Sequence, residues 1–329
     1  MKMIKRWRRF LCAGVLAGWA GLFLVSCATP EAVDDEPLPP AEPLPAMSYR
    51  EAATRYNQHV SGLERLWSRS VVEVSWIEDD GDRRSEQGEG HFVFVPPRRV
   101  ALSVGKLGKT ILWAGSNDER YWLIDNQGDG IAYVGKHPTV EVVGPTGDTE
   151  MRGPLPFKPD DVPFLMGLRP LPLEEDHEEG ATQAAAGRAV ARADQRAYVV
   201  TPPRGRVRLH LEPERMLPIR VDLFDAAGNL AARSELSKHQ RLDQVGTPVN
   251  TWPTLATEAR LRPADPDRPD RVDPEQRLRL ILSGLTADSR KIKDRAFDFD
   301  TLLRVYEPAE VTLLDPPTQR VAPLPATRP

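Results

Sequence analysis

Residues 88–125 read GEGHFVFVPPRRVALSVGKLGKTILWAGSNDERYWLID, and this stretch decides the fold. It contains short apolar runs separated by breaks that are rich in Pro, Gly, Asn and Asp. Short runs with many β-branched and aromatic residues predict β-strands, and breaks of this composition predict turns. The predicted strands are residues 90–95, 100–104, 110–114 and 121–124, and together they predict an antiparallel meander.

The alternation of side chains within this meander indicates that both faces of the sheet are apolar. Phe92 and Phe94 fall on one face, and Val93 and Val95 fall on the other. A sheet with two apolar faces must cover another layer or enclose a space. Alternation does not distinguish a filled core from a binding cavity.

The N-terminus is typical of an exported lipoprotein. Residues 1–26 combine a basic start, an apolar run at 10–25 and the sequence Leu24-Val25-Ser26 before Cys27. This tetrapeptide resembles the bacterial lipobox, which implies cleavage before Cys27 and diacylglycerol on its thiol. An ordinary signal peptide and a membrane-spanning anchor are the alternatives. Ala28 is not the aspartate associated with inner-membrane retention, so the resemblance favours an outer-membrane anchor that faces the periplasm.

The charge and cysteine content exclude several classes of function. Removal of the five basic residues in the signal would change the formal net charge from −4 to −9. An acidic chain is a poor general nucleic-acid ligand, and we expect it to gain nothing from an anionic membrane surface beyond its lipids. Cys12 would leave with the signal, so a chain lipidated at Cys27 would have no free thiol.

The remainder divides into a tether, one domain and a tail. Residues 27–47 are acidic and proline-rich and predict an extended tether, and residues 316–329 predict a disordered tail. The domain, residues 48–315, begins with the capping-box sequence Ser48-Tyr49-Arg50-Glu51 and an apolar stripe that predicts an amphipathic helix as far as Trp67.

The rest of the domain predicts mainly strands. Further strand patterns follow to residue 314, and the apolar segment 155–171 predicts either a core helix or a lid. Residues 174–195 predict a surface insertion, and residues 263–274 predict a loop. We therefore expect an α+β, mainly β fold, in which about ten to twelve strands form a curved antiparallel sheet, an incomplete half barrel with short lid helices.

Two segments carry a resemblance to a known superfamily. Residues 111–122, ILWAGSNDERYW, and residues 218–225, PIRVDLFD, before Gly228 are similar to hairpins of the LolA/LolB-like periplasmic carriers of lipoproteins and lipids. With Cys27, the chain resembles the lipidated, receptor-like kind. The resemblance implies a half barrel whose concave face binds acyl chains, with a periplasmic carrier protein as a possible partner. It also implies that an exposed leucine in the loop between the third and fourth strands contacts the membrane, and Leu107 occupies that position. A chance leucine in a turn is the alternative.

The candidate residues for lining an acyl-chain cavity are apolar residues of the strands and of the 155–171 segment. They are Phe92, Phe94, Leu102, Trp113, Trp122, Phe164, Leu165, Met166, Leu209 and Val221.

No catalytic, metal or cofactor motif is present in the sequence. The six histidines form no zinc-spaced pair, and the chain has no nucleophile elbow, no P-loop and no dinucleotide fingerprint. We therefore expect a protein that is not an enzyme and that uses neither a metal nor a cofactor. Its expected role is lipoprotein sorting or lipid transfer. A lipid-detecting envelope-stress sensor and a structural lipoprotein with a filled core are the alternatives.

Overall fold

A computed structural model describes residues 43–77, 81–137, 157–173, 187–192, 196–203, 205–225, 227–244, 247–265 and 268–314. Residues 43–329 form a compact unit of their own, and all of the structure reported below lies within it. The signal segment, Cys27 and the predicted tail lie outside the described residues, as does the predicted tether up to residue 42.

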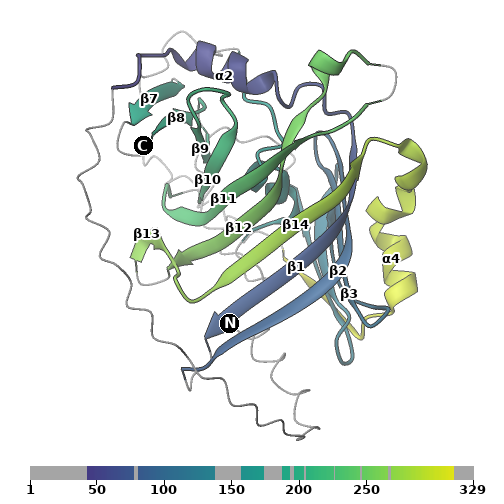
Figure 1. Cartoon of the computed structure of the whole chain (residues 1–329). Coiled ribbons are helices and arrows are strands. Elements are labelled where there is room, and N and C mark those ends of the chain that lie inside the picture. The colour runs from purple at the N-terminus through teal and green to yellow at the C-terminus, as the bar shows by residue number, and fades with distance from the viewer. Residues whose placement is uncertain are drawn as a thin grey trace, which may run out of the picture. The chain divides into compact units, whose positions relative to one another are not determined.

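The fold is an open, curved β-sheet (Figure 1). Its hydrogen-bonded order is β15-β6-β5-β4-β3-β2-β1-β14-β12-β11-β10-β9-β8-β7, with β13 paired to β12, and β7 and β15 form its two ends. The pairs are antiparallel except for β15 with β6. The strands are β1 (Leu66–Ile77), β2 (Arg83–Val95), β3 (Arg99–Lys106), β4 (Lys109–Ser116), β5 (Arg120–Asp125), β6 (Ile131–Lys136), β7 (Arg188–Arg192), β8 (Ala197–Thr201), β9 (Val207–Leu211), β10 (Pro218–Phe224), β11 (Leu230–Arg241), β12 (Thr254–Asp265), β13 (Arg268–Val272), β14 (Arg277–Thr286) and β15 (Glu310–Leu313).

The predicted meander is present in β2, β3, β4 and β5. Its register places Phe92 opposite Leu102, Leu102 opposite Ala114 and Ala114 opposite Leu123. The expectation of a mainly β, open curved sheet is confirmed. The expected number of strands is too low, because the sheet has fifteen strands within the described residues.

Two of the additional strands lie where the sequence predicts none. β7 occupies part of the predicted insertion 174–195, and β13 occupies part of the predicted loop 263–274. Both have five residues, and arginine, aspartate or proline interrupts their apolar pattern. A short strand at the edge of a sheet needs little apolar surface, so its pattern resembles that of a loop.

Helix α2 (Tyr49–Asn57) begins as predicted, and the Ser48 hydroxyl accepts a hydrogen bond from the Glu51 amide at 3.2 Å. It ends earlier than predicted. Leu63 is buried in the turn that follows, and Trp67 belongs to β1. The apolar residues after Asn57 fit a helical stripe, but a turn and an alternating strand bury them equally well.

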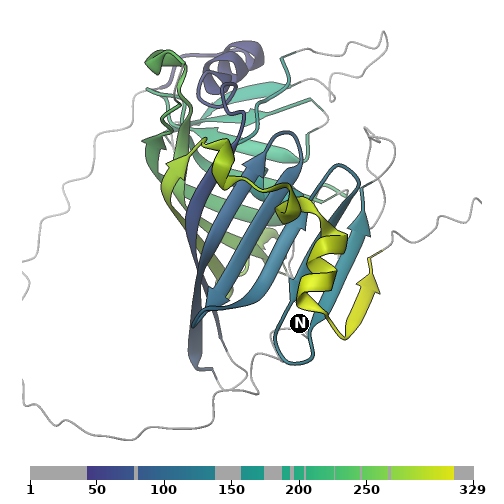
Figure 2. The ribbon, with the colours of Figure 1, turned by 90° about the vertical axis from the view of Figure 1, so that its right-hand side faces the viewer.

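The remaining helical elements are short. They are η1 (Pro159–Asp161), α3 (Val162–Leu165), η4 (Val249–Thr251), η5 (Ser289–Lys291), η6 (Asp294–Phe297) and α4 (Phe299–Tyr306). The predicted apolar helix at 155–171 is thus reduced to η1 and α3 within its described part. Figure 2 shows α4 lying across the meander side of the sheet. None of the helices in the described ranges is long and apolar enough to cross a membrane.

Candidate functional site

One face of the sheet, called the inner face here, is predominantly apolar. On the meander it carries Phe92, Leu102, Ala114 and Leu123, which stand opposite one another on β2 to β5. Each of these four side chains is buried or nearly so. They form one apolar band across four adjacent strands.

The band continues on the other half of the sheet. Val72 of β1 stands opposite Leu280 of β14, which stands opposite Ala259 of β12. Further along, Val221 of β10 stands opposite Leu209 of β9. All five side chains are buried, so the inner face is predominantly apolar from β9 to β5.

Several buried serines lie on this face, and two of them, Ser70 and Ser234, differ from the rest in their hydrogen bonding. Ser70 stands opposite Leu282 on β14, and Ser234 stands opposite Val221 on β10, so both belong to the inner face. Both side-chain oxygens are buried and have no hydrogen-bond partner among the described residues. An unpaired buried hydroxyl costs about 1–3 kcal/mol. These two positions are the inner-face sites at which a polar atom of a ligand would be stabilised.

Helix α2 and the segment 157–173 form a joined cover. The Tyr56 hydroxyl lies 3.0 Å from the Gly167 carbonyl oxygen and 2.9 Å from that of Arg169. The Asn57 side chain donates to the Leu171 carbonyl and accepts from the Leu171 amide, both at 2.8 Å. Burial raises the pKa of Tyr56 well above its ordinary value. The hydroxyl therefore stays protonated and keeps its hydrogen.

This cover lies against the inner face. An added Cβ at Gly167 would stand 2.7 Å from Pro218 of β10 and 3.3 Å from Leu236 of β11, and the φ of Gly167 is +62°. The position therefore requires glycine both for its backbone conformation and for its close approach to the sheet. Leu165 and Met166 in this segment are fully buried, and Phe164 is half-buried under the Arg169 guanidinium, 4.1 Å from the ring centroid.

The other end of the cover lies beside the meander, next to a cluster of titratable groups. His137 Nε2 donates to the Asn117 carbonyl at 3.0 Å, and its Nδ1 lies 3.5 Å from Asp160 Oδ2. Burial lowers the pKa of His137. Next to Asp160, burial and the Asp160 charge raise the pKa of Asp161 to about 6, although its carboxylate accepts a hydrogen bond from the Lys158 amide at 3.0 Å.

Two of the candidate lining residues lie on the opposite, outer face. Trp113 and Trp122 pack against α4, with ring centroids 5.9 Å from Tyr306 and 5.5 Å from Phe299 respectively. This placement corrects the sequence prediction for these two tryptophans. Both faces of the meander are apolar, so composition did not reveal which face each residue joins. By register, Phe92, Phe94, Leu102, Leu209 and Val221 belong to the inner face, and Leu165 and Met166 belong to its cover.

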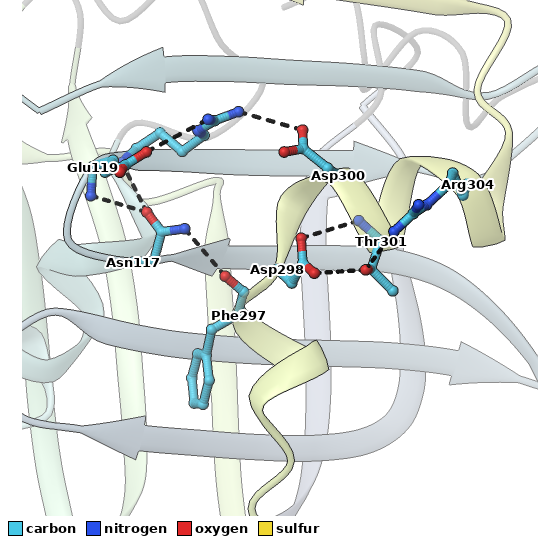
Figure 3. Close-up of polar contacts among 8 residues, drawn as sticks. Asn117, Glu119, Phe297, Asp298, Asp300, Thr301 and Arg304 are labelled. Atoms are coloured by element: carbon cyan, nitrogen blue, oxygen red, sulfur yellow. Dashed lines mark hydrogen bonds and ion pairs between the residues drawn. The ribbon is translucent and has the colours of Figure 1, made fainter.

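Polar contacts fix the start of α4 on this outer face (Figure 3). Asn117 donates to the Phe297 carbonyl at 3.1 Å, and Arg120 lies 3.5 Å from Asp300. Asp298 caps the helix by accepting from the Thr301 amide at 3.1 Å. The C-terminal segment thus covers the outer-face tryptophans, and the inner face is left as the candidate binding surface.

Leu107 lies at the tip of the turn between β3 and β4, as the sequence predicts. Its side chain is 97 % exposed. Leu107 and Gly108 have φ values of +52° and +77°, and Lys106 pairs with Lys109. Positive φ at both central residues is typical of a type I′ turn, in which Asn and Gly are the favoured residues. Leucine at the first central position is therefore unfavourable locally and gains no burial.

The outer face of β9 to β12 carries a charged network that the sequence analysis missed. Asp222, 1 % exposed, accepts from Arg233 Nε at 2.6 Å and from Arg220 Nη2 at 2.7 Å. Burial alone would raise the pKa of Asp222, but the hydrogen bonds from His210, Arg220 and Arg233 lower it well below its ordinary value. The signal available in the sequence is arginine at alternate strand positions, as in RVRLH at 206–210.

A second carboxylate in the network is equally buried. Glu258, 1 % exposed, contacts Arg279 Nε at 2.8 Å and Lys238 Nζ at 2.9 Å. Hydrogen bonds from these two cations lower the pKa of Glu258 to about 2. Both carboxylates are therefore ionised at neutral pH. Within the described ranges, no group of three or more His, Cys, Asp or Glu side chains is arranged to hold a metal ion.

No protein-family model matches the chain, and no curated protein matches its sequence. The chain is similar to the solved structure of a LolA superfamily protein from Nitrosomonas europaea, with 9 % identity and a TM-score of 0.42 over 78 % of this chain and 99 % of that one. A DUF1329 family protein from Desulfovibrio piger is similar at 13 % identity and a TM-score of 0.36, over 77 % of this chain and 97 % of that one. A putative outer membrane lipoprotein-sorting protein domain from Vibrio parahaemolyticus is similar at 9 % identity and a TM-score of 0.37, over the same shares of the two chains. The solved structures that this chain resembles thus include a LolA superfamily protein and a domain named for lipoprotein sorting.

Proposed function

We propose that this protein is a lipid-anchored envelope protein that binds acyl chains on the inner face of its sheet, in lipoprotein sorting or lipid transfer. The observation that carries the proposal is the predominantly apolar inner face under a short cover formed by α2 and the segment 157–173. The proposed organisation is a signal peptide at 1–26, lipidated Cys27 on a tether to residue 47, the domain at 48–315 and a tail at 316–329. The anchor would face the periplasm, with the outer membrane favoured.

The energetics explain why a carrier would be needed. Each exposed methylene costs about 0.8 kcal/mol in water, so an acyl chain of about sixteen carbons costs on the order of 12 kcal/mol. An apolar face removes this cost without directional bonds, which permits release to a membrane. The Ser70 and Ser234 hydroxyls would serve as donors to the ester carbonyl groups of such a ligand.

The cover provides a route for the ligand. Tyr56 and Asn57 bind backbone groups of residues 167–171, so α2 and the segment 157–173 would move as one piece. The opposite end of the segment lies against the meander, where Asp160 Oδ2 is 3.5 Å from His137 Nδ1. Release of that end would expose the inner face without unfolding the sheet.

The test is the binding of an acyl-chain fluorophore to residues 43–329, with mass spectrometry of the lipid that co-purifies. This boundary keeps Pro45, whose carbonyl accepts a hydrogen bond from Tyr198 at 3.0 Å. Replacement Leu165→Glu in the cover should weaken binding. Trp113→Ala, on the outer face, should lower stability and leave the affinity of the folded protein unchanged. A folded domain that carries no lipid and binds no fluorophore would rule the proposal out.

A second candidate function is a structural envelope lipoprotein with a filled core. Phe92, Phe94, Leu209 and Val221 are at most 3 % exposed, which is the burial expected of ordinary core residues. This candidate predicts that residues 43–329 are purified without lipid and that no inner-face substitution affects any binding activity.

A further inference from the structure

The outer face of the sheet between β9 and β1 carries two rows of charged side chains, called the arginine face here. In the first row Arg208, Asp222, Arg233 and Arg262 stand directly opposite one another on β9 to β12. The second row crosses from β10 to β1 and consists of Arg220, Glu235, Arg260, Arg279 and Glu73. Lys238, Glu258 and Arg277 complete the arginine face.

The carboxylates at the centre of this face lie beneath the cations. Asp222 and Glu258 are 1 % exposed, whereas the side chains of Arg233 and Arg260 are 22 % and 49 % exposed. An approaching molecule therefore meets guanidinium groups first. Figure 1 shows β11, β12 and β14 crossing the front of the view with no helix drawn over them.

The face is also positive overall. It holds eight cationic side chains and four carboxylates, a net charge of +4, although the whole chain carries −4. Arg233 stands directly opposite Arg262, and Arg260 stands directly opposite Arg279. Carboxylates of the face offset the repulsion within these two pairs, and the excess positive charge remains available to an anion supplied from outside.

The chemistry favours phosphate over an acidic protein surface. Guanidinium groups bind both phosphate and carboxylate oxygens in bidentate geometry, so the apolar content of the face decides between the two. The core of a protein–protein interface is apolar, but none of the large apolar side chains on described strands β9 to β12 or β14 is exposed. We propose that the arginine face docks the domain onto the anionic headgroups of a phospholipid bilayer. Net charge predicted that the protein gains nothing from an anionic membrane surface, and this inference revises that expectation. The inference does not depend on acyl-chain binding.

The experiment measures flotation of residues 43–329 with vesicles of phosphatidylcholine, with or without phosphatidylglycerol. The protein should bind only the vesicles that contain phosphatidylglycerol, and binding should weaken as salt is added. The variant Arg208→Gln/Arg262→Gln/Arg277→Gln removes three cations and leaves the contacts of Asp222 and Glu258 intact. Its affinity for these vesicles should fall roughly a hundredfold, at about tenfold or less for each residue.

A matched control separates the arginine face from the total charge. Arg50→Gln/Arg295→Gln/Arg304→Gln makes the same change in net charge at exposed positions outside this face. It should retain nearly all of the vesicle affinity, and thermal melting should show that both triple variants are folded. The proposal would be overturned if both triple variants lost the same vesicle affinity. It would also be overturned if wild-type binding did not depend on phosphatidylglycerol.

Discussion

Leu107→Asn separates a functional role of this leucine from a structural one, because the two roles predict opposite changes in stability. The leucine is in the left-handed region, at φ +52°. That conformation costs most residues roughly 1–2 kcal/mol, and asparagine tolerates it better. Because the side chain is 97 % exposed, its removal forfeits almost no packing. The variant should therefore be more stable by up to about 1 kcal/mol, a rise in Tm of about 2 °C.

The same variant should transfer lipid more slowly. A leucine that enters a membrane gains roughly 1.5–3 kcal/mol, which is up to about a hundredfold in a contact equilibrium. Lys106 and Lys109 flank it and are both exposed. Each would add on the order of 1 kcal/mol of attraction to acidic headgroups. We therefore expect Leu107→Asn to slow the transfer of an acyl fluorophore from residues 43–329 to liposomes.

The assay pairs thermal melting with the transfer rate on one protein. Val305→Asn is the control, because Val305 is an exposed apolar residue on α4, 65 % exposed and on a different element. It should leave transfer unchanged. A lower Tm in Leu107→Asn would show that the leucine packs against the fold, and an unchanged transfer rate would refute the membrane contact.

The other predictions concern lipidation and two buried carboxyl groups. Cys27→Ala should prevent acylation and leave the uncleaved precursor in the inner membrane, and a wild-type intact mass without acyl groups would contradict this. Asp161 binds its proton more tightly in the folded state, with a pKa of about 6, than in the unfolded state, so its contribution to stability falls as pH rises from about 4 to 6. Asp161→Asn should thus raise Tm at pH 7 more than at pH 4, and an equal change at both values would refute this. Asp222→Asn leaves Arg220 and Arg233 without a buried counter-charge and should cost about 3–5 kcal/mol. Its pKa is lowered in the fold, so the contribution of Asp222 is present above the unfolded pKa and is lost as the pH falls below it. The difference in urea midpoint between the wild type and Asp222→Asn should accordingly shrink in acid, and a constant difference would refute the assignment.

The sequence predicted the strands of the meander better than it predicted the helices. Each of β2 to β5 contains one predicted strand of the meander, and the turn at Leu107 lies where the sequence places it, because strand and turn formers alternate sharply there. Helix α2 was predicted too long because the apolar residues that follow it fit two periodicities. No helix was assigned at α4 from the sequence, since its eight residues carry too few turns to establish a period.

The candidate site was predictable only in part, and the tryptophans show why. Alternation correctly predicts that Phe92 and Val93 lie on different faces, but it does not state which face encloses the ligand. That assignment depends on where α4 and the segment 157–173 dock, far away in the sequence. Trp122 needs an adjacent glycine, since an added Cβ at Gly115 would stand 2.7 Å from its ring. Such pairing across strands becomes visible only when the register is known.

The net charge of the chain is a similarly limited predictor of how the protein would contact a membrane. Net charge averages over the whole chain, whereas a membrane contacts one face. The alternating arginines at 206–210, 258–262 and 277–281 gather on one face only because the register aligns their strands. β1 and β3 end on the side of the sheet where β14 begins, so Arg277 lies toward the same end as the turn at Leu107. A basic face and an exposed leucine at one end of the sheet would supply two separable contacts. The arginines would set the time spent at an anionic surface, and the leucine would act on the transfer step.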